Sequence, residues 1–338
     1  MFKNIVLYDW DDITEVFSDL QYVTSSTKLI GYSGWQNLDD AIQDATIVYI
    51  CDGVQTVPGM SDKSLIDKYS QNVRQAVMYC SELNPKAMLV IASNPVPCFV
   101  PMAIEEYKKS NVAGEKKIFG LARTYVSKAN SIIGRHFNID PSKVNCHVVG
   151  GIHRNTCIPV LSQIQQGTNI KRAENENLTR RIQEVEEDYL HDKMRVRNKK
   201  GCYLLAAYAG ADFITSLGKA YNGDRNIVEC AFVKQESPID KYARYLTSLV
   251  KIGEEGIISC HLPKLSELEK SRLNLAKEDI IDSICTGENF VTGETRITAK
   301  HRPKIEKPKK IQTCQWSKPS STDPCKQIEA PKTMKVPV

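Results

Sequence analysis

Several features are missing from this sequence of 338 residues, and each absence excludes a class of protein. No apolar run approaches the roughly 20 residues that a membrane-spanning helix needs, so we expect neither a transmembrane helix nor a membrane partner. Residues 1–10 have no charged region followed by a long apolar core, which argues against a secretory signal. An internal repeat is also absent, and this argues against solenoid and propeller architectures.

Cysteine is present without a pattern. The eleven cysteines occur singly, and no CxxC pair or Cys/His spacing suits a metal ion. An odd number of scattered cysteines favours reduced thiols in a reducing compartment over a disulfide framework. We therefore expect no metal site and a cytoplasmic or cytoskeletal location.

The positive charge is concentrated in the C-terminal tail, defined here as residues 294–338. The tail carries eleven Lys and Arg against four acidic residues, a net +7, whereas residues 1–293 carry 34 and 36, a net −2. Six of the fifteen prolines and one aromatic residue, Trp316, also lie in the tail. Because this composition cannot bury a core of its own, it predicts an extended segment that is disordered in isolation.

The first half of the chain alternates between strand and helix signals. Near-continuous apolar strands are predicted at 5–8, 45–51, 87–92 and 117–120. Helical signals occur at 39–43, 64–83, 101–110 and 125–137. Buried strands between amphipathic helices are typical of a parallel sheet that is covered on both faces.

The second half has a different pattern. Strands are predicted at 144–149 and 227–233, and helices at 175–198, 203–217 and 266–285. Ser266 and Glu269 have the spacing of a capping box at the start of the last helix. The sequence thus predicts an α/β domain at 1–140, an α+β domain at 141–293 and the extended tail at 294–338.

Several short runs occur in a recognisable order along the chain. They are GVQTVPGM (53–60), VIASNPV (90–96), KIFGL (117–121), DPSKVNCHVVGG (140–151), AYAGADF (207–213) and IVECAFVK (227–234). From Asn4 to Val291 the chain resembles NAD-dependent malate dehydrogenases of the mitochondrial and proteobacterial type. The resemblance implies a truncated Rossmann-type sheet domain, followed by a lactate/malate dehydrogenase-type C-terminal domain.

The resemblance also locates the dinucleotide site. In the family, a Gly-rich turn after the first strand holds the pyrophosphate at a helix N-terminus. Here the strand at 5–8 matches the family's second strand, and no Gly-rich turn precedes it. Asp9 matches the acid that holds the adenine ribose, although a solvated strand-end acid is the better explanation of it. Asn94 matches the Asn near the nicotinamide, and a turn-forming Asn-Pro explains it equally well. We expect both positions to be vestigial and no cofactor to bind.

The substrate-binding positions differ from the family pattern. The family uses three arginines to recognise two carboxylates and to polarise the carbonyl, because a planar guanidinium binds a carboxylate in bidentate fashion. The matching positions here are Thr56, Asp62 and Lys128. A lysine ammonium does not replace the planar fork, and Asp62 would repel a dicarboxylate.

The acid/base positions differ as well. In the family a His directly follows Gly-Gly and is oriented by an Asp. Here Ile152 follows Gly150-Gly151, His153 comes one residue later, and Tyr125 occupies the position of the Asp. A shift of one residue at a strand end turns a side chain to the opposite face, so we expect His153 to be displaced from the catalytic position.

These substitutions predict a catalytically inactive malate dehydrogenase-like protein, a pseudoenzyme with a structural or scaffold role in a larger assembly. The basic tail would bind tubulin, as on a microtubule, or another acidic protein surface. Nucleic acid is not expected as a partner, and a homo- or hetero-dimer is compatible with the fold. The alternatives are an NAD-dependent malate dehydrogenase that binds NAD, with a mitochondrial location, or an inactive partner subunit of such an enzyme.

Overall fold

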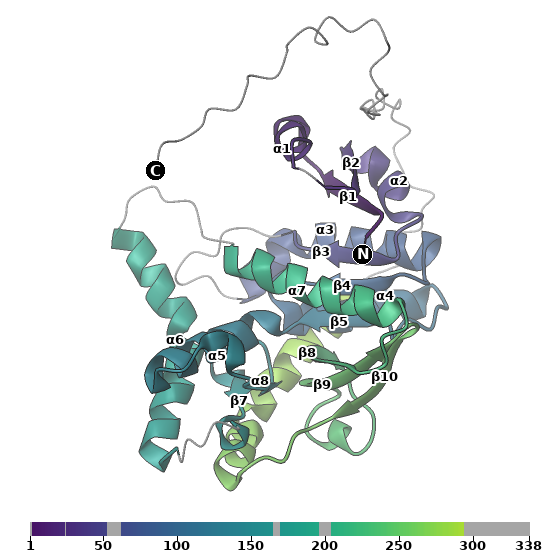
Figure 1. The fold of residues 1–338 in the computed structure, drawn as a ribbon. Helices are drawn as coiled ribbons and strands as arrows, with labels where there is room; N and C mark the ends of the chain where they lie inside the picture. The colour runs from purple at the N-terminus through teal and green to yellow at the C-terminus, as the bar shows by residue number, and fades with distance from the viewer. Residues whose placement is uncertain (1, 24, 53–61, 165–169, 196–203, 294–338) are drawn as a thin grey trace, which may run out of the picture.

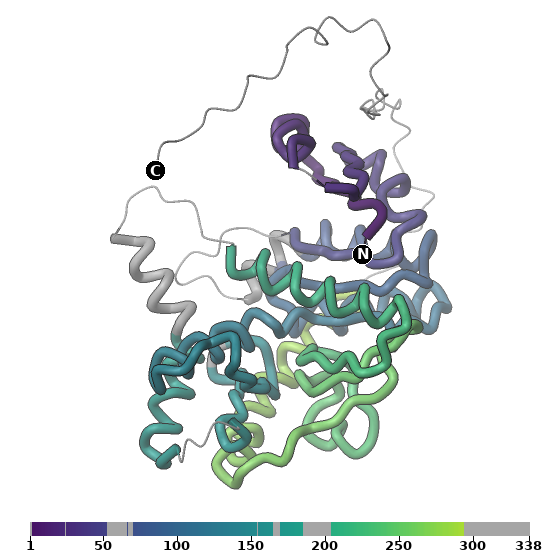
Figure 2. Tube along the Cα trace, viewed as in Figure 1, coloured from purple at the N-terminus to yellow at the C-terminus, as the bar shows by residue number. Residues whose placement is uncertain are grey.

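An eight-stranded sheet forms the centre of the protein (Figure 1). The structure is a computed structural model, and it describes residues 2–23, 25–52, 62–164, 170–195 and 204–293, which Figure 1 shows in colour; Figure 2 traces the chain as a tube in the same view. The strand order is β3-β4-β5-β8-β9-β6-β7, and β10 pairs with β9. Among the described residues, no helix is both long and apolar enough to cross a membrane.

The parallel part of the sheet contains β3 (Ile47–Ile50), β4 (Met88–Ile91) and β5 (Ile118–Leu121). Helices α3 (Asp62–Leu83) and α4 (Val96–Lys109) connect these strands. Every residue of β4 and β5 is buried, as expected of parallel strands with helices on both faces. The predicted parallel sheet of an α/β fold is therefore confirmed.

The segment at 45–51 was predicted to be fully buried, and this is wrong for most of it. Ile47, Val48 and Tyr49 of β3 are only half-buried. The reason is topological, because within the described residues β3 pairs with β4 alone and so forms one edge of the large sheet.

The antiparallel part of the sheet comes from the second half of the chain. Its strands are β6 (Val148–Gly150), β7 (Cys157–Pro159), β8 (Ile227–Lys234), β9 (Tyr245–Gly253) and β10 (Gly256–His261). Because β8 pairs with β5, a single sheet runs across the domain boundary that the sequence predicts near residue 140. The sequence pattern did not predict β9: its first six residues are all buried, so it lacks polar alternation.

A second, two-stranded sheet contains β1 (Asn4–Asp9) and β2 (Lys28–Ser33), which pair in parallel. With α1 (Thr14–Leu20) and α2 (Leu38–Ile42) these strands belong to the N-terminal lobe, defined here as residues 2–52, whose last strand is β3 of the large sheet. The two-stranded sheet lies on the β3 side of the large sheet (Figure 1). Leu38 and Ile42 anchor the lobe, since both belong to the main core cluster.

The remaining helices are α5 (Arg123–Phe137), α6 (Arg172–Arg195), α7 (Leu204–Tyr221) and α8 (Glu267–Thr292). Short 3-10 helices lie at Trp35–Asn37, Pro141–Lys143, Arg154–Thr156, Leu161–Gln163 and Ile239–Lys241. The strand predicted at 144–149 is shorter than expected, because pairing with β7 and β9 involves only Val148–Gly150. The C-terminal tail lies outside the described residues.

Two helix starts can be compared directly with their predictions. The capping box of α8 is confirmed: Ser266 N–H donates to Glu269 Oε2 at 2.7 Å, and Ser266 Oγ accepts from Glu269 N–H at 3.4 Å. Helix α4, predicted to start at Pro101, starts five residues earlier at Val96. Pro97 lies in its first turn, where a missing N–H costs no helical hydrogen bond.

Helices α4 and α8 approach each other closely at Gly287. A Cβ atom built on Gly287 would lie 2.0 Å from the carbonyl oxygen of Cys98. A backbone carbonyl cannot move aside as the end of a flexible side chain can. Position 287 therefore requires a residue without a side chain.

We predict that Gly287→Ala destabilises the fold by about 1–3 kcal/mol, because overpacking separates the two helices. Helix propensity alone predicts the opposite sign, a gain of about 1 kcal/mol. Urea unfolding measures the difference, with Asn289→Ala on the exposed face of α8 as the control. A stabilised Gly287→Ala variant would contradict the close approach.

A pH dependence follows from His147, which precedes β6. Burial, and then the charge of His261, lower the pKa of His147 below its usual 6.5. As pH falls below 6.5 the unfolded chain binds a proton that the folded state resists, so stability declines on acidification. We predict that the melting temperature of His147→Gln changes less steeply with pH between pH 5 and 7 than that of the wild-type chain. An unchanged slope would argue against this assignment.

Candidate functional site

A cavity of about 310 Å³ opens where the segment after β6 meets α8. The residues that line it are Pro97, Gly151, His153, Asn155, Thr156, Asp279, Ile280, Asp282 and Ser283. Three of the polar residues come from residues 153–156 and three from one face of α8. Sequence reasoning identified only His153 among them, because the packing of α8 against this segment is a tertiary contact. The available signal was the i, i+3, i+4 spacing of Asp279, Asp282 and Ser283.

Two glycines shape the wall of this cavity. Gly150 has a φ of +95°, a conformation that side chains disfavour. A Cβ on Gly151 would lie 2.2 Å from Thr156 Oγ1, so only glycine fits against the returning chain. Gly151 N–H donates to the Thr156 carbonyl at 2.8 Å, and Thr156 N–H donates to the His153 carbonyl at 2.9 Å. These bonds hold residues 151–156 in a tight turn.

The turn points the side chains of Ile152 and His153 in different directions. Ile152 is 6% exposed and belongs to the main core cluster. His153 lines the cavity, where Asp279 and Asp282 provide two exposed carboxylates. The structure thus directs the residue at the matching catalytic position into the core and the displaced imidazole into the cavity. The two carboxylates oppose the entry of a dicarboxylate substrate.

Tyr125 and Lys128 contact each other on the buried face of α5. Their exposed fractions are 3% and 9%, and Lys128 Nζ lies 4.7 Å from the centroid of the Tyr125 ring. This distance is typical of a cation–π interaction. Neither side chain lines the cavity around His153.

The structure describes the other predicted substrate-binding and cofactor-binding positions only in part. Thr56 lies outside the described residues. Asp62 is the first residue of α3, and its side chain is likewise outside the description. Asn94 is exposed and joined to Pro95 by a cis peptide bond, directly before α4. It lies three residues before Pro97, which lines the cavity.

The carboxyl ends of β1 and β3 form the region to which the resemblance assigns the dinucleotide. Asp9 is exposed, and its Oδ1 accepts a hydrogen bond from Asp11 N–H at 3.1 Å. Among the described residues, Asp52 Oδ2 and Tyr8 Oη are buried without a hydrogen-bond partner.

This region fits only one part of a dinucleotide. The exposed Asp9 carboxylate can accept hydrogen bonds from ribose hydroxyls. The turn from β1 into α1 contains Asp11 and Asp12 and no glycine, and Glu15 lies in the first turn of α1. Negative charge at a helix N-terminus opposes phosphate binding. The described residues at the end of β1 therefore fit a ribose, and the negative charge beside them disfavours a neighbouring phosphate.

A polar cluster that the sequence did not reveal joins α5, α7 and β8. Arg123 Nη1 donates to Glu229 Oε2 at 2.8 Å, and its Nη2 donates to Asp212. Ser216 Oγ donates to Glu229 Oε1 at 2.6 Å. Burial raises the pKa of Glu229, while the Ser216 hydrogen bond and Arg123 oppose that shift. These hydrogen bonds all join members of the cluster to one another. The arrangement therefore fits a structural connection between the elements better than a ligand site.

Comparisons with known proteins agree with this architecture. The model of the lactate/malate dehydrogenase NAD binding domain matches residues 1–120, and that of the lactate/malate dehydrogenase α/β C-terminal domain matches residues 126–291. Mitochondrial malate dehydrogenase from Homo sapiens is 31% identical over 290 residues, which cover 86% of this chain and 84% of that protein. The Bos taurus protein of the same name gives the same figures.

Solved structures share the fold. Malate dehydrogenase from Picrophilus torridus superposes with a TM-score of 0.71 at 15% identity, covering 86% of this chain and 92% of that chain. Lactate dehydrogenase from Eimeria maxima with NADH and oxamate gives 0.69 at 18% identity, covering 87% and 90%. Two matching domain models and 31% identity to mitochondrial malate dehydrogenase lead to one conclusion: this chain belongs to the lactate/malate dehydrogenase family.

Proposed function

We propose that this chain is a member of the family that does not interconvert malate and oxaloacetate, and that it has a structural role in a larger assembly. The observation that carries the proposal is the burial of Ile152. At the position where the resemblance implies an acid/base imidazole, the side chain is 6% exposed and has no proton to exchange.

The other changed positions support the same proposal. Tyr125 replaces a carboxylate that would stabilise an imidazolium, and a neutral phenol provides no such charge. Lys128 is packed over that ring rather than lining the cavity. Residues of a catalytic unit act together, so the loss of one member already costs several orders of magnitude in rate.

NAD is the cofactor to which the matched NAD binding domain points. We propose that this chain binds it weakly, through the ribose contact of Asp9. The negative charge of Asp11 and Asp12 beside Asp9 supports weak binding, because it repels the anionic dinucleotide. Asn94 remains available near the predicted nicotinamide position.

An active NAD-dependent malate dehydrogenase is the second candidate. Its support is the family itself, since relatives at 31% identity carry the name malate dehydrogenase, mitochondrial. His153 would then act as the acid/base group, because its side chain lines the cavity. Those names also favour the mitochondrial alternative for location over the cytoplasmic or cytoskeletal prediction. The predicted dimer, tubulin partner and partner-subunit role stay predictions.

We predict that the purified full chain gives no oxaloacetate-dependent oxidation of NADH above a protein-free control. A bovine mitochondrial malate dehydrogenase assayed in parallel is the positive control, within the usual enzyme range of about 10⁴–10⁸ M⁻¹s⁻¹. Turnover by this chain that disappears in His153→Ala would establish the second candidate instead.

We also predict that Ile152→His destabilises the chain by about 2–4 kcal/mol without creating activity, because the imidazole enters the apolar core. Ile152→Val is the matched control, with an expected loss of about 0.5–1.5 kcal/mol. Urea unfolding measures both. If Ile152→His is as stable as Ile152→Val, the buried orientation of residue 152 is wrong.

A further inference from the structure

The N-terminal lobe carries a strong negative charge that the body of the protein does not neutralise. Residues 1–52 contain nine acidic residues, Asp9, Asp11, Asp12, Glu15, Asp19, Asp39, Asp40, Asp44 and Asp52, against two lysines, a net −7. Seven of the nine are exposed, all except Asp39 and Asp52. None of the nine forms a salt bridge with any residue that the structure describes.

The same lobe exposes apolar side chains. Six of the fifteen exposed large hydrophobic residues of the described chain lie within its first 23 residues: Ile5, Val6, Val16, Leu20, Tyr22 and Val23. Ile5 and Val6 belong to β1, which pairs with β2 alone within the described residues and so leaves one edge unpaired. An exposed edge strand with apolar side chains is normally covered by another segment. A segment that is both basic and apolar would complement this surface.

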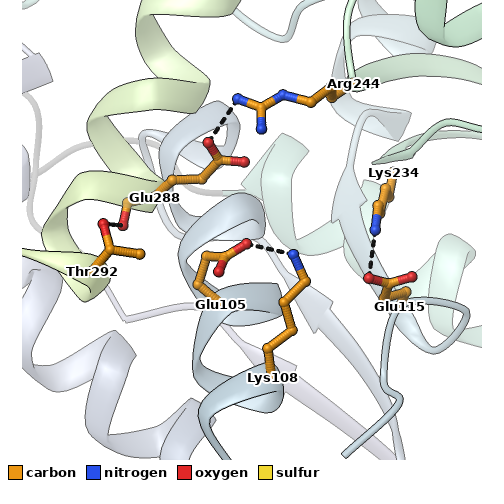
Figure 3. Close-up of polar contacts among 7 residues, drawn as sticks. All are labelled: Glu105, Lys108, Glu115, Lys234, Arg244, Glu288 and Thr292. Carbon is orange, nitrogen blue, oxygen red and sulfur yellow. Dashed lines mark hydrogen bonds and ion pairs between the residues drawn. The ribbon is translucent and has the colours of Figure 1, made fainter. Parts of the chain in front are cut away.

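The C-terminal tail has that chemistry. Its net charge of +7 equals the lobe's −7 in magnitude, and Ile297, Ile305 and Ile311 are interspersed among its cations. Before the tail, the last turn of α8 is held in place, since Arg244 Nη2 donates to Glu288 Oε2 at 2.8 Å and Thr292 Oγ1 donates to the Glu288 carbonyl at 3.0 Å (Figure 3). The tail therefore begins at a defined point on the body.

That starting point lies within reach of the lobe. The guanidinium carbon of Arg74 on α3 lies 5.5 Å from the centroid of the Phe290 ring on α8, and α3 also packs against α2 of the lobe. A flexible chain of 45 residues has an end-to-end distance of about 40 Å. Tethering places the tail at an effective concentration in the millimolar range around the lobe, which favours an intrachain contact over an external acidic partner.

We propose that the C-terminal tail docks on the N-terminal lobe of the same chain and covers β1 and α1. Its lysines and arginines pair with the exposed carboxylates around Asp11 and Asp19, and its isoleucines cover Ile5 and Val6. The docked tail would neutralise the lobe and lie over the carboxyl end of β1, where Asp9 is located. This contact does not depend on whether the chain catalyses malate oxidation.

Hydrogen–deuterium exchange of the full chain tests the docking. Amides of residues 4–20 should exchange several-fold faster in a variant with Lys304, Lys307, Lys309 and Lys310 all changed to Glu than in the wild-type chain. A charge-swapped variant, in which Asp11, Asp12, Glu15 and Asp19 are also changed to Lys, should restore slow exchange. Asp224→Lys with Glu254→Lys, two exposed sites outside the lobe, is the matched control and should leave exchange at residues 4–20 unchanged.

Carboxyl–amine crosslinking of an equal mixture of ¹⁴N- and ¹⁵N-labelled full chains separates the remaining possibilities. The docking predicts crosslinks from tail lysines to lobe carboxylates within chains of one isotope, lost in 1 M salt, where the screening length falls to about 3 Å. Crosslinks that join the two isotopes, or that fall equally on Asp224 and Glu254, would overturn the intrachain proposal. Unchanged exchange in the tail variant would overturn it as well.

Discussion

The turn at residues 150–156 determines where the side chains of the candidate site lie. Gly150 adopts a positive φ, and the absence of a Cβ on Gly151 leaves room for Thr156 Oγ1, which lies 2.2 Å from where that Cβ would be. The backbone bonds between Gly151, His153 and Thr156 then fix which way each side chain points. Ile152 enters the core and His153 faces the cavity. The imidazole is therefore one residue away from the position where the resemblance implies an acid/base histidine.

The difference between local patterns and tertiary contacts explains how much of the protein the sequence could predict. The buried strands β4 and β5 and the capping box at Ser266 follow from local patterns, and the structure confirms them. Strand β9 lacks alternation because it is covered on both faces, and Asp279 reaches the cavity only through the packing of α8. Local sequence patterns contain no information on such tertiary partners, so these features could not be predicted.

Charge is the second organising feature. The family fold accounts for the core and the sheet, but it does not require an acidic lobe at one end of the chain and a basic tail at the other. In the sequence, residues 1–293 average to a net −2, which conceals the −7 of residues 1–52. Only the placement of β1 and α1 at the surface, with carboxylates beside exposed Ile5 and Val6, identifies the lobe as a candidate partner for the tail.

The proposed function requires that this member of the family does not transfer a hydride to oxaloacetate. The most direct measurement incubates a high concentration of the full chain with oxaloacetate and deuterated NADH, and then measures deuterium in malate by mass spectrometry. We expect no deuterated malate above the protein-free control. Deuterated malate that increases in proportion to the amount of chain would contradict it.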